Sequence, residues 1–521
     1  MPITPYTGTF GTTQLKHLLR RTLFGVTKAD LAAFSGQTMS QVVTSLLNPA
    51  SPSPLPPVVD YTGDPTIAQG STWVNGPSDG NLQTSRQQSL RGWWIGLMVN
   101  QNRDILEKMV LFWHNQMPID SGNVPNEAIY CYRYVKLLRD NALGNFKTLI
   151  KQITIDPAML YYLDGRNNSK TAPNENYARE LQELFTVGKD TSPYYTEADV
   201  QAAAKVLTGW RVDNTNLISY FDSTRHETAS KTFSSFYNNT VITGQSDSNA
   251  GNTELDALLN MIFAKDEVAK YIVRKLYRFF VYYKIDATVE ANVIVPLADL
   301  FRTGPVGGQP YDIKPVIEAL LTSDHFYQSA QIGCMIKNPI DYVVGFARVF
   351  NVDFPADSDP NNQYRNWRYL HDSAYAMQMR VGNPPNVAGW PAYYQEPNFH
   401  ELWVNSETLR KRKEFTDRLI TSNFNGSNMD VIAFTATLNS PADPNLLIDE
   451  VIQLVHIIDS DSSIKTQLKS ILLSGQATDN YWTDAWNAYL SNPSTSNTNT
   501  VKNRLNSFYQ AIVGMAEYLL H

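Results

Sequence analysis

Apolar residues recur at helical spacing along most of the chain, and no other feature constrains the fold more. Near the amino terminus, Leu15, Leu18 and Leu19 lie three and four residues apart, which places their side chains on one face of an α-helix. Comparable patterns occupy residues 12–47, 84–115, 126–139, 145–154, 174–188, 196–210, 254–264, 267–283, 289–302, 313–322, 339–350 and 367–381. The sequence therefore predicts a mainly α-helical protein, a large multi-helix array with long irregular loops and at most a small β-hairpin element.

Four stretches interrupt the helical pattern. Residues 48–80 are rich in Pro, Ser, Gly and Asp, which predicts a long irregular excursion of the kind that often serves function. Residues 212–253 carry Thr, Ser, Tyr, Phe and Asn with little helical period, so we expect an ordered loop or a short hairpin there. Residues 351–366 are expected to form a loop, and residues 491–500 a polar linker.

The composition argues against several classes of protein. Of 521 residues 18% are charged, the net charge is −7 and no basic block occurs, which argues against a nucleic-acid partner. No stretch approaches the ~20 apolar residues that span a bilayer, and the amino terminus lacks the features of a signal peptide. The two cysteines, Cys131 and Cys334, have no metal-ligand spacing and cannot make a disulfide framework. We therefore expect a soluble protein without a membrane span.

The segment from Asn174 to Gly188 carries the densest set of polar side chains. Thr171 or Asn174 can cap the amino end of a helix here, and Gly188 can supply the left-handed residue that ends it. The apolar face consists of Tyr177, Leu181, Leu184 and Phe185, and the polar face of Asn176, Glu180 and Glu183. The pairs Glu175–Arg179 and Arg179–Glu183 have i,i+4 spacing.

Two interpretations of this polar face remain open. An exposed helix with ordinary ion pairs would explain the charges. However, the face carries almost no lysine, and a polar turn that begins at Asp164 precedes it, which favours a helix that faces a cleft. A buried Glu180 would need a cationic or hydrogen-bonding partner, or the pKa of Glu180 would rise; either outcome marks a candidate site.

Three of the eight histidines stand in informative surroundings. His114 ends an apolar helix, His226 lies five residues before Lys231, and His400 follows a proline-rich loop. A single histidine beside aromatic residues is more often a buried structural residue than a ligand. Together with Glu180 or Glu183, His114 and His226 could nevertheless hold a divalent metal as two histidines and one carboxylate. Neither the His-Glu-x-x-His nor the Glu-x-x-His spacing occurs to support such a site.

Glu180 and Glu183 could instead serve as acid and base in a hydrolase. They lie one turn apart on one helix, whereas the two carboxylates of glycosidases flank the substrate, so a better second carboxylate would be Asp164 or Glu227. The loop of residues 382–391 presents Trp390 either as an exposed ring that stacks on a sugar or within a packed structural corner. No Gly-x-Ser-x-Gly elbow, P-loop or Rossmann glycine motif occurs.

Six short motifs occur in a fixed order along the chain. They are HLLRRTLFG from His17, FWHN from Phe112, NENYARELQELFTVG from Asn174, YTEADV from Tyr195, LTGW from Leu207 and PNVAGWP from Pro385. Together they resemble the bacterial family called domain of unknown function 1800, from about His17 to about Arg412, and His226 with Lys231 resembles the His-then-Lys pair of that family. This resemblance implies one family-type helical domain over residues 1–412. Residues 413–521 would then form a C-terminal helical extension.

The resemblance brings no established activity. Many family members look like exported proteins encoded beside a sulfatase-like or alkaline-phosphatase-like partner. This implies an extracytoplasmic setting, although no signal peptide is visible, and a polysaccharide or sulfated substrate. The resemblance also makes the polar motif residues the site candidates: His114, Asn115, Glu175, Arg179, Glu180, Glu183, His226 and Lys231.

Three hypotheses follow. The first is a hydrolase acting on an extracellular polymer, such as carbohydrate, with Glu180 as acid or base and His114, His226 or Glu183 as the second proton-transfer group. Its substrate-binding residues would be Asn115, Glu175, Asn176, Arg179, Lys231 and Trp390. The second is a non-catalytic partner or escort of the sulfatase- or phosphatase-like protein, and the third a metal-dependent enzyme using His114, Glu180 and His226. Convergence of these residues around one cleft would favour an enzyme, and scatter would favour the partner.

Overall fold

The computed structural model describes residues 3–49, 53–122, 124, 128–189 and 194–521, and these residues are mainly helical, as predicted. Two segments are π-helical, η2 (Leu181–Thr186) and η5 (Glu290–Ile294). The α-helices of the first half are α1 (Thr12–Thr22), α2 (Lys28–Phe34), α3 (Met39–Leu46), α4 (Gln83–Val99), α5 (Leu106–Gln116), α6 (Ala128–Asp140), α7 (Phe146–Thr154), α8 (Pro157–Tyr162), α9 (Asn176–Glu180), α10 (Glu197–Val206) and α11 (Ala250–Phe263). Those of the second half are α12 (Asp266–Phe280), α13 (Ala287–Val289), α14 (Val295–Thr303), α15 (Ile313–Leu321), α16 (Pro339–Val349), α17 (Pro360–Ala376), α18 (Ser406–Thr421), α19 (Val431–Ala436), α20 (Pro444–Val455), α21 (Ser462–Leu472), α22 (Asn480–Ser491) and α23 (Thr495–Val513). Short helical turns are η1 (Gly165–Asn167), η3 (Ser223–Arg225), η4 (Ser235–Tyr237), η6 (His325–Tyr327), η7 (Ser329–Gln331), η8 (Pro391–Tyr393), η9 (Phe399–Trp403) and η10 (Ala516–Leu519).

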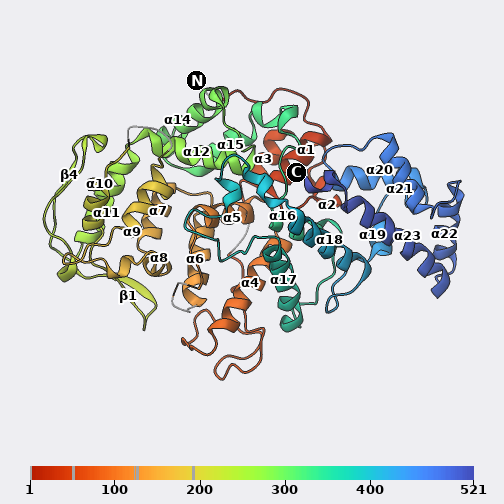
Figure 1. The fold of residues 1–521 in the computed structure, drawn as a ribbon, viewed down its shortest axis with the longest axis horizontal. Helices are drawn as coiled ribbons and strands as arrows, with labels where there is room; N and C mark the ends of the chain where they lie inside the picture. Colours follow the sequence, from red (N-terminus) through yellow and green to blue (C-terminus); the bar gives the residue numbers. More distant parts are fainter. Residues whose placement is uncertain (1–2, 50–52, 123, 125–127, 190–193) are drawn as a thin grey trace.

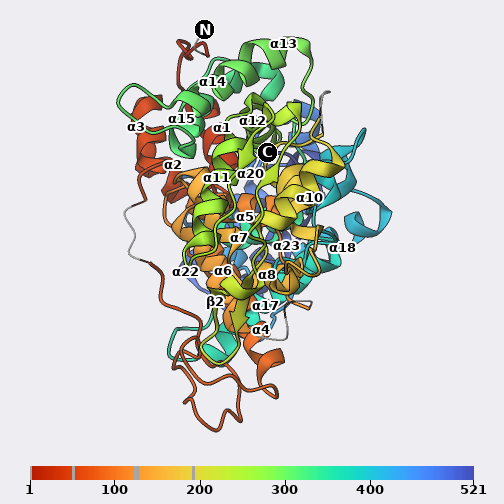
Figure 2. The same ribbon diagram turned by 90° about the vertical axis from the view of Figure 1, so that its left-hand side faces the viewer.

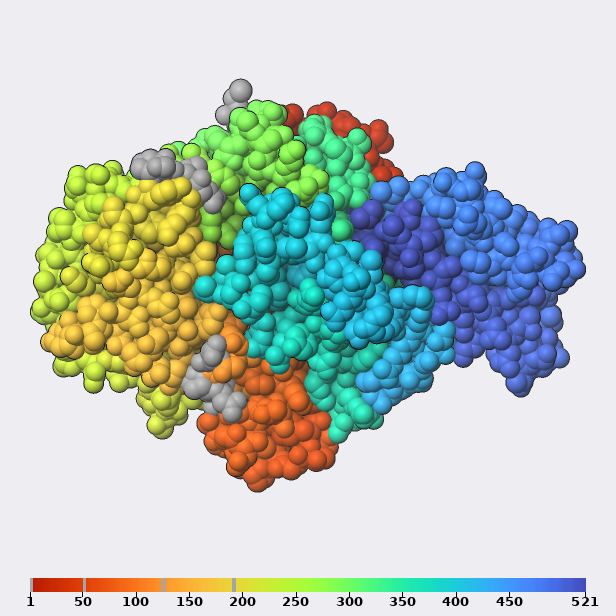
Figure 3. Space-filling view, viewed as in Figure 1, coloured from red at the N-terminus to blue at the C-terminus, as the bar shows by residue number. Residues whose placement is uncertain are grey.

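The helices are arranged in three parts along the longest axis of the molecule (Figure 1). Helices α7 to α11 and the strands form one end, and α19 to α23 form the other. Helices α1, α5, α12 and α16 occupy the middle, and the chain returns there at its last residues. The space-filling view shows the C-terminal helices (blue) as a projection, and the part that includes residues 53–82 (orange) protrudes below the middle (Figure 3). The turned view places these residues at the end opposite α13 and α14 (Figure 2).

The β-structure of the described chain is confined to residues 210–242 apart from isolated bridges, close to the expected hairpin region. Strand β1 (Trp210–Asp213) pairs antiparallel with β2 (Ile218–Phe221), with Trp210 opposite Phe221. Strand β3 (Lys231–Thr232) pairs antiparallel with β4 (Val241–Ile242), with Lys231 opposite Ile242. The two pairs are separate two-stranded sheets. Such short sheets form no β-core of their own and depend on packing against the neighbouring helices.

The start of helix α10 agrees with the sequence and ties it to this β-structure. Thr196 caps the helix and Asp199 completes a capping box, as the spacing of these residues indicates. The carboxylate of Asp199 also accepts hydrogen bonds from the backbone N–H of Ser234, at 2.7 Å, and from its hydroxyl, at 2.7 Å. One buried carboxylate therefore fixes both the helix end and the loop after β3.

Close contact between α4 and α17 explains the glycines of α4. A Cβ atom on Gly96 would lie 2.5 Å from the ring of Trp367, and one on Gly92 would lie 3.1 Å from the carbonyl oxygen of Tyr364. The missing side chains allow the two helices to pack directly. The rest of the interior is one continuous apolar cluster that reaches from α1 to α23.

Two helix starts differ from the prediction. Helix α17 begins at Pro360, inside the expected loop of residues 351–366, because Asp359 caps it and Pro360 fits its first turn. Helix α23 begins at Thr495, inside the expected linker of residues 491–500, because the Ser494 hydroxyl accepts the N–H of Asn497. The expected start of another helix at residue 126 lies outside the described residues. Within the part of the chain that the structure describes, no helix has the length and apolar character to cross a membrane.

Candidate functional site

The segment expected as one helix from Asn174 to Gly188 is two segments. Helix α9 ends at Glu180, and the π-helical η2 continues from Leu181. The buried Gln182 stabilises the junction, because its Nε2 donates to the carbonyl of Ala178 at 3.1 Å and its Oε1 accepts from the hydroxyl of Tyr237 at 2.8 Å. Gly188 then adopts a φ of 77°, the left-handed residue that the sequence predicted. Single π-helical turns are rare in proteins, and those that occur often lie at functional sites.

Most charges on this face have partners. Arg179 bonds the carboxylate of Glu175 at 3.0 Å and also the carboxylate of Glu197. Lys189 bonds Glu183 at 2.6 Å. The Glu197 carboxylate raises the pKa of Arg179, so the guanidinium stays charged. The expected Glu175–Arg179 pair is thus present, whereas Arg179 turns to Glu197 instead of Glu183.

Glu180 differs from these neighbours. Its carboxyl group is half-buried, and within the described residues no hydrogen bond or ion pair to it is formed. Burial raises the pKa of Glu180, and the negative charge of Glu183 raises it further. A carboxyl group in this state retains its proton to higher pH than an exposed glutamate, which is the property that a general acid requires.

Two tyrosines and a second carboxylate lie around Glu180. Burial, together with the charges of Asp120 and Glu180, raises the pKa of Tyr162 to about 12. Tyr162 therefore has a carboxylate near it from each of two separate elements, α9 and the loop after α5. Tyr195 is buried, and its hydroxyl has no hydrogen-bond partner among the described residues. The part of the chain that includes α9 and η2 (yellow) is exposed on the face shown in Figure 3.

Asp120 is held by backbone and side-chain donors. Its carboxylate accepts the N–H of Gly122 at 2.8 Å and the side-chain amide of Asn383. Asn383 in turn accepts from Arg91 at 3.1 Å and from the hydroxyl of Ser121 at 2.7 Å. Asp120, Tyr162 and Tyr195 were not among the residues predicted from the sequence, because the charge effects that connect Tyr162 to Asp120 and both tyrosines to Glu180 arise between residues distant in sequence.

His226 and Lys231 meet each other, as the His-then-Lys pair suggests, but in a closed buried network. His226 Nε2 lies 3.0 Å from one oxygen of Glu254, and Lys231 Nζ lies 2.5 Å from the other. His226 Nδ1 lies 2.9 Å from the carbonyl oxygen of Thr208. The side chains of His226, Lys231 and Glu254 are each at most 1% exposed. Glu254 was not among the predicted site residues, because its sequence signal is only that of a charged residue at the start of an apolar helix.

His114, Asn115 and Trp390 together hold the loop of residues 382–391. His114 Nε2 accepts the N–H of Gly382 at 3.0 Å, and the side-chain oxygen of Asn115 accepts the N–H of Trp390 at 2.9 Å. Burial lowers the pKa of His114 to about 3, so the ring is neutral. Trp390 is 1% exposed and meets His114 edge to face. Of the two alternatives for Trp390, the structure has the packed structural corner, because the ring is buried there.

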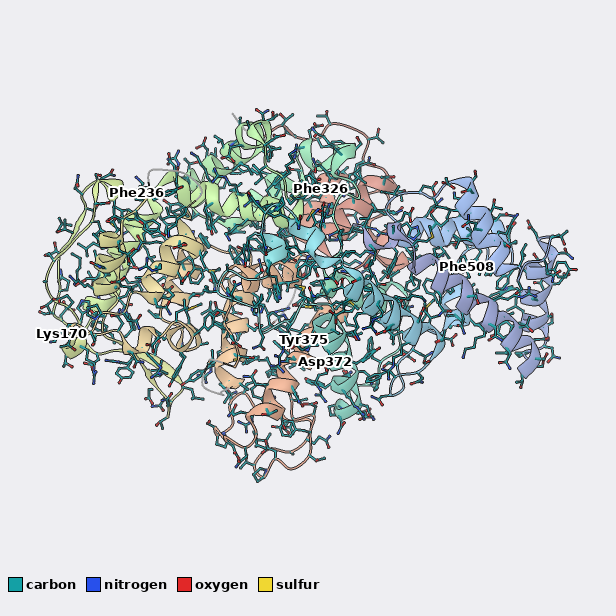
Figure 4. All side chains as sticks on the ribbon, in the orientation of Figure 1. Lys170, Phe236, Phe326, Asp372, Tyr375 and Phe508 are labelled. Atoms are coloured by element: carbon teal, nitrogen blue, oxygen red, sulfur yellow. The ribbon has the colours of Figure 1, made fainter. Side chains whose placement is uncertain are left out.

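The candidate residues do not gather around one cleft. The backbone N–H of Lys170 donates to the carbonyl of Arg225 at 2.8 Å, next to His226 in the chain. Lys170 lies at one edge of the molecule (Figure 4). Helix α5, which contains His114, lies in the middle (Figure 1). His400 is elsewhere again, with its Nδ1 accepting the N–H of Ile336 at 3.3 Å. Across the described residues, no three His, Cys, Asp or Glu side chains are placed to hold a metal ion. His114, Glu180 and His226 therefore form no metal site.

The comparison with known families agrees with the motifs. A family model described as "Protein of unknown function (DUF1800)" matches residues 17–520. The chain belongs to the DUF1800 family. The match also covers residues 413–520, for which the six motifs gave no resemblance. No curated protein and no solved structure matched the sequence, so the DUF1800 assignment brings a family without an activity.

Proposed function

We propose that this DUF1800 protein is a hydrolase in which Glu180 is the general acid, and that its substrate is an extracellular polymer of the carbohydrate class. The observation that supports this proposal is the half-buried Glu180 carboxyl group, whose pKa is raised and which has no partner within the described chain. A carboxyl group whose pKa is raised by partial burial and by a neighbouring carboxylate is a candidate for acid–base chemistry.

The second carboxylate of the proposed reaction is Asp120. Glu180 and Glu183 lie one turn apart, whereas Asp120 comes from a different element and its charge, like that of Glu180, acts on Tyr162. We choose Asp120 because the two carboxylates of such a reaction approach the substrate from opposite sides. Glu180 would donate its proton to the leaving oxygen of the bond that breaks, and Asp120 would accept a proton from the attacking water. Arg179, although paired, is cationic and adjoins this surface, and could bind a sulfate or carboxylate group of the polymer.

Hydrolysis of a panel of neutral and sulfated polysaccharides, followed by the release of reducing ends, tests this function. Glu180→Gln should lower the rate about 100-fold or more, since general acid catalysis contributes ~10²–10⁴-fold. The matched control is Glu414→Gln on α18, an exposed residue outside the proposed site. A Glu180→Gln variant that keeps the wild-type rate on a substrate that the protein hydrolyses would refute the role of Glu180.

One observation supports the second hypothesis, a non-catalytic partner of a sulfatase- or phosphatase-like protein. His114, His226 and Lys231 are buried, make structural contacts and do not converge with Glu180 on one cleft. By the criterion of convergence this scatter favours the partner, and it leaves the enzyme hypothesis dependent on the surface around Glu180. Co-purification with the protein encoded beside this one is the test. A stable complex, combined with full function of Glu180→Gln, would favour the partner hypothesis over the hydrolase.

A further inference from the structure

A group of buried cations lies where α1, α5 and α18 meet the residues just before α16. Arg20 and Arg21 come from α1, Lys108 from α5 and Arg412 from α18, and each is at most 6% exposed. Lys337 joins them, and its Nζ donates to the carbonyl of Tyr518 at 2.5 Å. Figures 1 and 2 both show the last residues of the chain in the middle of the molecule, next to this region. The motif HLLRRTLFG thus contributes two arginines to the interior instead of the surface.

Little negative charge faces these cations. Arg20 and Lys337 line one small cavity, and Arg21 and Lys108 line a second. Among the described residues Asp341 is the one acidic side chain that lines either cavity. Asp341 already pairs with Lys108 and accepts from the side chain of Asn338 at 2.7 Å. Its second oxygen lies 3.9 Å from Nδ1 of His521. One side-chain carboxylate therefore lines these cavities together with four basic side chains, in a region from which water is largely excluded and where unbalanced charge is costly.

Several hydrogen-bond donors of the arginines are also unused. Arg21 uses one nitrogen for the carbonyl of Gln331, at 3.3 Å, and Arg20 uses one for the carbonyl of Leu454, at 2.8 Å. Within the described chain, Nε and Nη1 of Arg21, Nε of Arg20, and Nε and Nη1 of Arg412 have no acceptor. Buried donors without an acceptor destabilise a fold, and a bound ion is one of the ways in which proteins satisfy them.

The size of the cavities limits which anion can accept hydrogen bonds from the unused arginine donors. Each has room for about one water molecule. Asp341 and His521 line both. A tetrahedral oxyanion such as phosphate or sulfate is considerably larger, whereas a monatomic anion is close to water in size.

We propose that this cationic centre binds a monatomic anion, and that chloride is the ligand. The anion lies in one of the two cavities that Asp341 and His521 share, and it accepts hydrogen bonds from the free donors of Arg20 or Arg21. In its absence burial lowers the pKa of Arg20 and of Arg412 to about 10 and that of Lys337 well below its ordinary value. A bound anion opposes these shifts, because it stabilises the charged forms. The site then stabilises the contact between the N-terminal and C-terminal parts of the chain.

Thermal unfolding of the full chain tests the proposal. Tm is measured in sodium chloride and in sodium gluconate at the same ionic strength, because gluconate is too large for either cavity. Chloride should raise Tm in a saturable manner by about 2 °C or more, because a ligand that binds only the folded state stabilises it. The double variant Arg20→Met, Arg21→Met, which removes the donors of both cavities, should abolish this dependence. Arg348→Met is the matched control, since Arg348 is also buried but pairs with Asp30, at 3.3 Å, and its variant should keep the response to chloride.

Direct observation gives a second readout that does not depend on the folding of variants. Crystals of the wild-type protein grown in bromide should show an anomalous peak between α1 and Asp341. The rival source of negative charge is the main-chain carboxyl group of His521. If that group balances the cations, Tm is independent of chloride and bromide binds only at the surface, and either result overturns the proposal.

Discussion

The network of His226, Lys231 and Glu254 and the surface around Glu180 use the same residue types in opposite ways. In the network, both oxygens of Glu254 have cationic or imidazole partners and all three side chains are excluded from solvent. At the surface, Glu180 is half-buried and its carboxyl group lacks a partner within the described chain. The comparison teaches that family motifs of polar residues can serve folding as well as chemistry. Completeness of the hydrogen bonding, rather than residue type, distinguishes the two.

The largest expected effect comes from breaking the closed network. Glu254→Gln keeps the shape of the side chain but leaves Lys231 as a buried charge without its carboxylate. Removing one partner of a buried ion pair lowers the free energy of unfolding by about 3–5 kcal/mol. Urea unfolding followed by circular dichroism measures the change, and Glu414→Gln on the exposed face of α18 should leave the midpoint unchanged. A Glu254→Gln variant as stable as wild type would show that the network is not structural.

A smaller loss is expected where the FWHN motif holds the loop of residues 382–391. Asn115→Ala removes the acceptor of the buried N–H of Trp390, whose distance to Asn115 is 2.9 Å. Leaving a buried donor without an acceptor costs about 1–3 kcal/mol. The same unfolding experiment measures this cost, and Trp390 fluorescence should shift to longer wavelength if the loop detaches. An unchanged midpoint would show that the hydrogen bond of Asn115 does not stabilise the fold, and Asn115 would then be a candidate for a functional role.

The sequence predicted local features of the fold well, because these depend on nearby residues. The apolar spacing indicated most helices, and the Thr196–Asp199 capping box and the left-handed Gly188 are present as predicted. The loop expected at residues 351–366 was wrong in part, since Asp359 and Pro360 supply a helix start that the polar composition hid.

The candidate site was less predictable, because partners came from distant segments. Glu254 reaches His226 across 28 residues of chain, and Asn115 reaches Trp390 across 275. No spacing rule in the sequence connects such pairs. Asp120 and Glu180, which are distant in sequence, both act on Tyr162. The sequence did identify Glu180 as the residue to examine, since its helix lacks the lysines of an ordinary exposed face.

The ion pairs that surround Glu180 should contribute less than either buried contact. Arg179→Met removes the bonds to Glu175 and Glu197, both of which are partly exposed. Exposed ion pairs are screened by water and salt, so the urea midpoint should fall only slightly. In 1 M sodium chloride the difference from wild type should vanish. A large loss of stability that persists at high salt would show that Arg179 makes a buried contact in solution in addition to the exposed ion pairs.

The smallest change in stability is expected when Glu180 itself is replaced. The sign of this change distinguishes a carboxyl group without a favourable partner from one that has such a partner. Because its pKa is raised in the folded protein above the ordinary value of 4.5, the unfolded chain loses the proton first as pH rises. Ionisation therefore lowers the free energy of unfolding of the wild type above about pH 4.5. Glu180→Gln should be equal to wild type at pH 3 and more stable, by a few tenths of a kcal/mol, at pH 7. If Glu180→Gln is instead less stable than wild type at pH 7, the carboxylate has a favourable partner in solution. Glu180 would then resemble Glu254, whose carboxylate is fully paired.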